Sequence, residues 1–83
     1  MKTEILKRVN EQNKNENGTY LTFEMDYDIR ENQYIIEVFD YETDEIVNTH
    51  TRSTNKSKMA QMSSVVDQYT LKGYRVWDEH FKF

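Results

Sequence analysis

The chain has no cysteine among its 83 residues, so it can form neither a disulfide framework nor a zinc site built on thiolates. Its first residues carry charges inside what would have to be an apolar run, which argues against a signal peptide and a membrane span. With only two glycines, no glycine-rich loop is present to cradle phosphate. These absences predict a cytoplasmic protein that has no membrane contact, metal or cofactor.

Basic residues are scarce in the middle of the chain. Residues 19–45 carry nine carboxylates and one base, Arg30, for a net charge of −8, whereas residues 1–18 sum to +1 and residues 46–83 to +3. Such an acidic stretch argues against a direct nucleic-acid partner and suits either a basic protein surface or simple solvation. Six tyrosines, four phenylalanines and one tryptophan would serve a small core or a contact surface equally well.

What the sequence does contain is a run of three predicted strands over residues 20–52. In the first of them, five apolar side chains alternate with five polar ones, which is the period-two pattern of a half-buried strand. The apolar positions are Leu21, Phe23, Met25, Tyr27 and Ile29.

A turn is expected at residues 30–33, and the register of the first hairpin is chosen so that one face is continuously apolar. On that face the expected pairs are Ile29–Tyr34, Tyr27–Ile36 and Met25–Val38. On the opposite face they are Asp28–Ile35, Asp26–Glu37 and Glu24–Phe39.

A second turn is expected at residues 41–44, where acidic and hydroxyl side chains can accept hydrogen bonds from nearby backbone. If Val38 pairs with Val47, then Ile36 meets Thr49 on the buried face. The alternate positions Ile46, Asn48, His50 and Arg52 then extend the opposite face, so the third strand is predicted to be a polar edge.

Two amphipathic helices flank the strands. Residues 1–10 place Ile5, Leu6 and Val9 at helical spacing, and the polar residues 10–18 are predicted to be a flexible connection. A second helix is expected from Met59 to a C-terminal cap at Gly73, after a run at residues 53–58 that offers several capping side chains. Its apolar positions are predicted to pack on the sheet rather than to bind a ligand: Met59, Met62, Val65, Val66, Tyr69 and Leu71.

Residues 74–77 are predicted to form a short final strand, parallel to either the first or the third strand. The tail that follows, with Phe81 and Phe83, either closes one end of the core together with Trp77 or presents an apolar partner segment. The chain is thus predicted to be an α+β domain in which one amphipathic helix packs on a three-stranded antiparallel meander. It is one domain over 1–83, with a short helix and flexible connection at 1–18 and the sheet and helix core at 19–83.

No candidate for catalysis or metal binding rises above background. His50 and His80 have no neighbouring ligand at metal spacing, and the acidic run 40–45 lacks the central glycine and terminal glutamate of a calcium-binding hand. The serines stand in no Gly-x-Ser-x-Gly turn. Asp26 and Glu37 would be opposed in the expected register, but acid–base catalysis also needs a pocket, which so small a sheet hardly offers.

The best candidate site is therefore the polar face of the meander, where carboxylates alternate with aromatic and aliphatic groups. Its residues are Tyr20, Glu24, Asp26, Asp28, Ile35, Glu37 and Phe39. Two interpretations have equal weight. Either this face docks a basic protein partner, or the N-terminal helix or the C-terminal tail folds over it.

The stretches 21–25 and 35–47 resemble the flagellar FlaG-type proteins, which carry a similar hairpin, an acidic Thr-x-Glu-hydrophobic turn and a following helix. The matching turn here is Thr43-Asp44-Glu45-Ile46, and the likeness covers residues 21–68. It implies a flagellar accessory role as one alternative. The main expectation is a non-enzymatic protein-binding module, such as a regulator or an inhibitor encoded by a phage or another mobile element. A homodimer through an edge strand is a further alternative.

Overall fold

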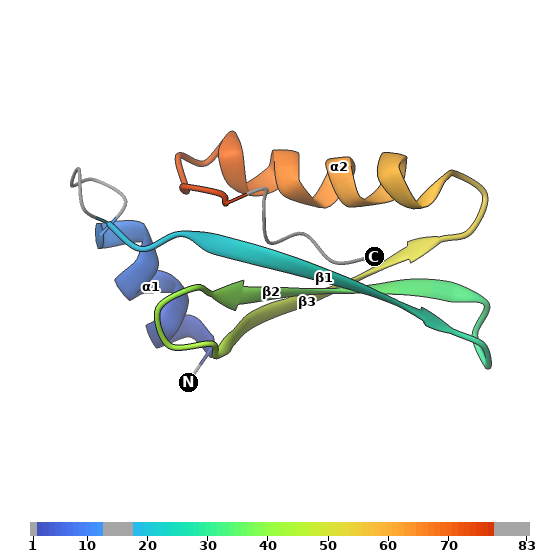
Figure 1. Cartoon of the computed structure of the whole chain (residues 1–83), viewed down its shortest axis with the longest axis horizontal. Helices are drawn as coiled ribbons and strands as arrows, with labels where there is room; N and C mark the ends of the chain where they lie inside the picture. The colour runs from blue at the N-terminus through green and yellow to red at the C-terminus, as the bar shows by residue number, and fades with distance from the viewer. Residues whose placement is uncertain (1, 13–17, 78–83) are drawn as a thin grey trace.

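The computed structural model describes residues 2–12 and 18–77, and it has the predicted α+β architecture. The elements follow in the order α1 (Lys2–Gln12), β1 (Leu21–Asp28), β2 (Gln33–Asp40), β3 (Ile46–Ser53) and α2 (Lys58–Thr70). The strands form one antiparallel sheet in the order β1-β2-β3, with α2 lying along it and α1 at one end (Figure 1). The connection predicted at 10–18 begins later than expected, because α1 continues to Gln12. Its residues 13–17 and the tail at 78–83, including His80, Phe81 and Phe83, lie outside the described residues.

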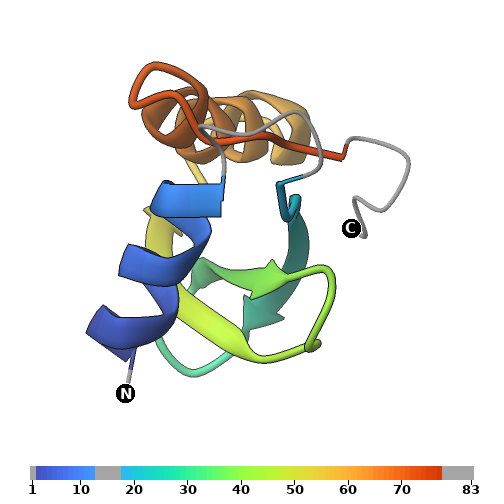
Figure 2. The ribbon, with the colours of Figure 1, turned by 90° about the vertical axis from the view of Figure 1, so that its left-hand side faces the viewer.

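The two faces of the sheet differ as the alternation in β1 predicts. The inner face, which α2 covers, carries the fully buried Phe23, Ile36 and Val38. The outer face carries the residues between them in sequence, among them Glu24 and Glu37. Figure 2 shows α2 along one side of the sheet and α1 standing beside it.

The predicted register of the first hairpin is wrong by two residues. Met25 lies opposite Ile36, and Glu24, not Asp26, lies opposite Glu37. The turn spans residues 29–32 because Asp28 ends β1 as a cap: its Oδ1 accepts hydrogen bonds from the backbone N–H groups of Arg30 and Glu31. Asn32 completes the turn at φ +49°, a left-handed conformation that asparagine tolerates well. A slip of two residues exchanges partners but leaves the side chains of β1 and β2 on their predicted faces. The exception is Ile29, which was predicted to pair with Tyr34 on the apolar face but lies in the turn and is 80% exposed.

The predicted register of the second hairpin is wrong by one residue, and here the faces do change. Ile36 lies opposite His50 rather than Thr49, and a bulge between Val38 and Phe39 absorbs the extra residue. Asn48, His50 and Arg52 consequently lie on the inner face beside α2, where the sequence had predicted outer-face positions. β3 is nevertheless an edge strand, as expected.

The core lies between α2 and the inner face. Met62, Val65 and Tyr69 of α2 are buried there, and the ring of Tyr69 meets that of Phe23 edge-on at 5.7 Å. Two of the core residues predicted for the second helix are not buried, since Met59 is 72% exposed and Leu71 87%. They lie in the first turn of α2 and just beyond its last turn.

Both ends of α2 carry the predicted signals. Ser57 caps the N-terminus, since its hydroxyl accepts a hydrogen bond from Ala60 N at 3.1 Å. At the C-terminus, Gly73 N donates to Thr70 O and Tyr74 N donates to Tyr69 O, both at 3.0 Å, which is the bonding pattern of a Schellman cap. Gly73 supplies the left-handed residue that this cap needs, at φ +91°.

The segment after α2 returns to β1 rather than to β3. Leu21 forms a parallel bridge with Val76, in which Leu21 N donates to Arg75 O at 2.8 Å and Trp77 N donates to Leu21 O at 3.0 Å. Within residues 74–77 this single bridge takes the place of the predicted final strand.

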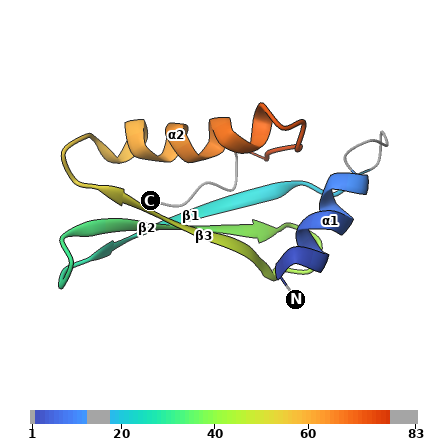
Figure 3. The ribbon, with the colours of Figure 1, turned by 180° about the vertical axis from the view of Figure 1, so that it is seen from behind.

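Helix α1 closes the end of the sheet at which β3 begins (Figure 3). Val9 is fully buried in the same core as Leu21 and Val47, while Ile5 and Leu6 pack against that core from its rim. The predicted apolar stripe of this helix is confirmed.

Candidate functional site

The outer face brings together most of the residues predicted for it, although with different neighbours. Glu24 lies directly opposite Glu37, and Asp26 lies opposite Ile35. Asp26 is exposed, whereas Glu24, Ile35, Glu37 and Phe39 are half-buried. Asp26 and Glu37 are therefore not the facing pair that acid–base catalysis would have used.

Asp28 lies at the end of this face, where its carboxylate is used by the turn. Besides the two backbone donors, its Oδ2 accepts a hydrogen bond from Gln33 Nε2 at 3.4 Å. Asp28 therefore shapes the β1–β2 turn.

Tyr20 belongs to an aromatic group that the sequence did not reveal. Its ring meets that of Trp77 edge-on at 5.3 Å, and the rings of Tyr41 and Trp77 are 4.6 Å apart and tilted by 31°. At the end of the β1–β2 ladder, Tyr41 N donates to Tyr20 O at 2.9 Å. We call Tyr20, Tyr41 and Trp77 the aromatic corner. Only the return of residues 74–77 to β1 assembles it, and sequence alone left that choice open.

Neither helix covers the central outer face. Val9 of α1 and Met62 of α2 both contribute to the core on the inner side, and Arg8 of α1 reaches Asp40, which pairs with the inner-face residue Leu21. On β3, the outer-face residues Thr49 and Thr51 are exposed. The sequence offered two segments that could fold over the outer face, the N-terminal helix and the C-terminal tail. The N-terminal helix does not cover it, and the tail lies outside the described residues.

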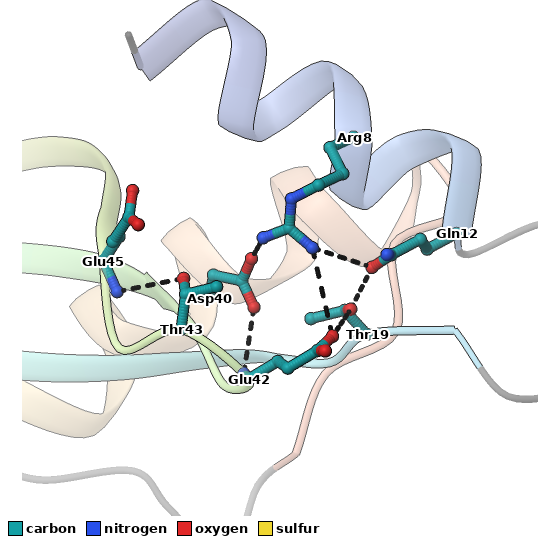
Figure 4. Close-up of polar contacts among 7 residues, drawn as sticks. All are labelled: Arg8, Gln12, Thr19, Asp40, Glu42, Thr43 and Glu45. Atoms are coloured by element: carbon teal, nitrogen blue, oxygen red, sulfur yellow. Dashed lines mark hydrogen bonds and ion pairs between the residues drawn. The ribbon is translucent and has the colours of Figure 1, made fainter.

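A buried charge fixes α1 to the β2–β3 turn (Figure 4). The Asp40 side chain is fully buried, and it forms an ion pair with the Arg8 guanidinium and accepts a hydrogen bond from Glu42 N at 2.9 Å. The hydroxyl of buried Thr19 can donate to either of two acceptors, Gln12 Oε1 or, at 3.0 Å, Glu42 Oε2, and Arg8 Nη1 donates to Gln12 Oε1 at 3.1 Å. Because Arg8 and Asp40 are far apart in sequence, no local pattern could have indicated this pair.

A second polar group lies on the inner face, between β3 and α2. Asn48 Nδ2 donates to Tyr69 Oη at 3.1 Å, and His50 Nε2 lies 2.6 Å from the same hydroxyl. Because Tyr69 accepts from Asn48, its own proton is directed to His50, which then acts as a neutral acceptor. Burial, followed by the charges of Arg52 and Lys72, lowers the pKa of His50 below its ordinary value of 6.5. Burial likewise raises the pKa of the Tyr69 hydroxyl above 10.0.

The hydrogen bonds of this inner group join β3 to α2. His50 and Asn48 both bond to the Tyr69 hydroxyl, and Arg52 donates to Ser64 Oγ at 3.2 Å and to Thr51 O at 2.8 Å. Across residues 2–12 and 18–77, no three histidine or carboxylate side chains gather closely enough to hold one metal ion.

No helix in the described part of the chain has the length and apolarity needed to span a membrane. The chain matches no family model, no curated protein and no solved structure.

Proposed function

We propose that the protein is a non-enzymatic binding module that docks a basic protein surface on its outer face. The main observation in support is that Glu24, Asp26 and Glu37 share this face with Ile35 and Phe39, away from both helices. Carboxylates supply attraction to cationic side chains, and half-buried apolar groups supply the surface that a partner can desolvate.

The charge distribution supports the same partner. Residues 19–45, which form β1, β2 and their turns, hold the net charge of −8, while the rest of the chain is slightly positive. The negative potential is thus concentrated on the sheet and its turns rather than spread over the surface. Such a field speeds encounter with a basic partner and weakens as salt is added.

The test compares two variants of equal net charge. Asp26→Lys/Glu37→Lys reverses the outer face, whereas Glu11→Lys/Asp67→Lys reverses two exposed carboxylates on α1 and α2. Full-length bait is incubated with cell extract, and bound protein is eluted by raising salt from about 0.1 M to about 0.5 M, over which the Debye length falls below about 5 Å. We expect a protein with a basic surface, identified by mass spectrometry, to bind wild type and the helix variant but not the outer-face variant.

Equal capture by both folded variants would assign any binding to net charge and overturn the proposal, as would capture that salt does not weaken. Circular dichroism confirms that each variant is folded. The flagellar accessory role that the resemblance implies stays a prediction, which gene neighbours encoding flagellar export or filament proteins would favour.

A further inference from the structure

We propose that three side chains held by α2 close the free edge of β3 and keep the chain from pairing, strand to strand, with a second copy of itself. An edge strand offers a row of backbone donors and acceptors to any extended chain, and β3 has eight residues with no proline among them. The closing side chains are Asn48, Arg52 and Gln61. This inference concerns the edge of the sheet and is independent of docking on its outer face.

The backbone groups at the free edge of β3 follow from the pairing of the sheet. Asp40 N donates to O of Glu45, the residue before β3, at 2.9 Å, so the even-numbered residues of β2 direct their backbone groups toward β3. Those residues lie opposite residues 48, 50 and 52, which bond back to β2. The alternate residues of β3 therefore point their N–H and C=O groups outward. They are Thr49, Thr51 and Ser53, all exposed.

Each of these three residues has one outward backbone group bonded to a side chain, so a neighbouring strand would find that group already taken. The bonds run from Thr49 N to Asn48 Oδ1 at 2.9 Å, from Arg52 Nη1 to Thr51 O at 2.8 Å and from Gln61 Nε2 to Ser53 O at 2.7 Å. A second strand could pair along this edge only after displacing all three side chains.

Helix α2 holds the three side chains in place. Asn48 Nδ2 donates to Tyr69 Oη at 3.1 Å. Arg52 Nε donates to Ser64 Oγ at 3.2 Å, and Gln61 is itself a buried residue of α2. Each side chain thus joins the helix to the edge of the sheet. None of them can leave the edge without losing a hydrogen bond or its burial at α2.

The bulge in the second hairpin makes this arrangement possible. In a register without the bulge, Asn48 and Arg52 would lie on the outer face, away from α2. The extra residue turns both of them inward, where their side chains reach the helix as well as the backbone of their own strand. Bulges and inward-pointing charged residues are devices by which natural sheets protect an edge strand.

The test removes two of the three side chains from the full-length chain. The edge variant, Asn48→Thr/Arg52→Thr, keeps a strand-forming residue at both positions but leaves Thr49 N and Thr51 O open. The matched turn variant, Asn55→Thr/Lys56→Thr, makes the same exchange at two exposed residues after β3 and also loses one positive charge.

Molar mass is measured by size-exclusion chromatography with light scattering over a range of protein concentrations. We expect wild type and the turn variant to keep the mass of one chain. The mass of the edge variant is expected to double, because two copies of β3 can pair about a two-fold axis. Circular dichroism confirms that each variant is folded.

Amide hydrogen exchange tests the side-chain caps in wild type itself, so the proposal can be judged even if the edge variant fails to fold. Thr49 N–H donates to Asn48, whereas Thr51 N–H also faces the edge but has no acceptor within residues 2–12 and 18–77. After correction for intrinsic rates, we expect Thr49 to exchange about 5- to 10-fold more slowly than Thr51.

Four results would overturn the proposal. They are a wild-type chain that already pairs with itself, a folded edge variant that stays monomeric, a turn variant that associates as strongly as the edge variant, and equal exchange at Thr49 and Thr51. Each of them would leave docking on the outer face unaffected, since the edge variant retains every residue of that face.

Discussion

The two faces of the sheet differ in how deeply their side chains are buried and in how their charges are arranged. On the inner face, Phe23, Ile36 and Val38 are fully buried, and the polar groups of β3 find partners on α2. On the outer face, two glutamates lie directly opposite each other and apolar side chains are only half-buried. The inner face is arranged for stability, whereas the outer face keeps features that stability alone would not select.

That difference is measurable with one residue type on both faces. We expect Phe23→Ala to lower the free energy of unfolding by about 3–5 kcal/mol, because it removes a fully buried ring and leaves a cavity beneath α2. The matched change on the outer face, Phe39→Ala, removes a half-buried ring and is expected to cost about 1–2 kcal/mol. Urea unfolding followed by circular dichroism measures both values. Equal losses would show that the outer face is buried as deeply as the inner one.

The inner face also contains a charge, and its partner comes from α1. We expect Arg8→Met to lower the free energy of unfolding by about 2 kcal/mol, because Asp40 would be left as a buried carboxylate without its counter-ion. The value lies below that of a fully enclosed pair because the Arg8 side chain is itself 36% exposed. Lys7→Met, an exposed neighbour on the same helix, is the control and is expected to change little.

A double-mutant cycle with Asp40→Asn sharpens this result. If the two side chains act as a pair, the double variant loses less stability than the two single variants together. Strict additivity would show that Arg8 contributes through packing rather than through its charge.

Stability is expected to fall below pH 6.5 through His50. Because the folded state holds this imidazole neutral, its pKa lies below 6.5 there, and the unfolded chain takes up the proton first as the pH decreases. The contribution is thus complete above pH 6.5 and is lost as the pH falls from there to the lowered pKa of the folded state. Thermal unfolding between pH 7.5 and pH 5 measures it.

Two variants separate the effect of His50 on the pH dependence of stability from the effects of other titrating groups. His50→Gln is expected to flatten the pH dependence over that interval. His80→Gln removes the other histidine of the chain and should leave the contribution of His50 in place. A wild-type slope that persists in His50→Gln would assign the loss to other groups.

The sequence predicted the faces of β1 and β2 but not their partners. Alternation fixes which side chains share a face, and a slip of two residues preserves it, so periodicity could not separate the pair Met25–Val38 from the observed Met25–Ile36. Turn chemistry decided the register. Asp28 and Asn32 are residue types that favour turns, and they indicated the observed turn. The prediction instead chose the register that matched apolar side chains across the strands.

The third strand and the aromatic corner were beyond sequence reasoning for different reasons. In β3, alternate positions are similarly polar, so no pattern revealed the bulge that turns Asn48 and His50 inward. The corner depends on whether residues 74–77 return to β1 or to β3, and either strand offered an edge. The sequence predicted which residues share the outer face, since Glu24, Asp26, Ile35, Glu37 and Phe39 do lie on it, but it did not predict the aromatic corner.

The smallest expected effect is a gain in stability on the outer face. Glu24 and Glu37 are directly opposed, and like charges in that position destabilise a sheet. We expect Glu37→Gln to raise the free energy of unfolding by about 0.5 kcal/mol, measured by urea unfolding at low salt, and the gain to shrink as salt screens the repulsion. Glu31→Gln, in the exposed turn at residues 29–32, is the control for removing one negative charge elsewhere. If the same Glu37→Gln variant also binds the basic partner less tightly, then the outer face retains a destabilising pair because binding requires it. If it is no more stable than wild type, the opposed glutamates carry no such cost and the contrast between the two faces is one of burial alone.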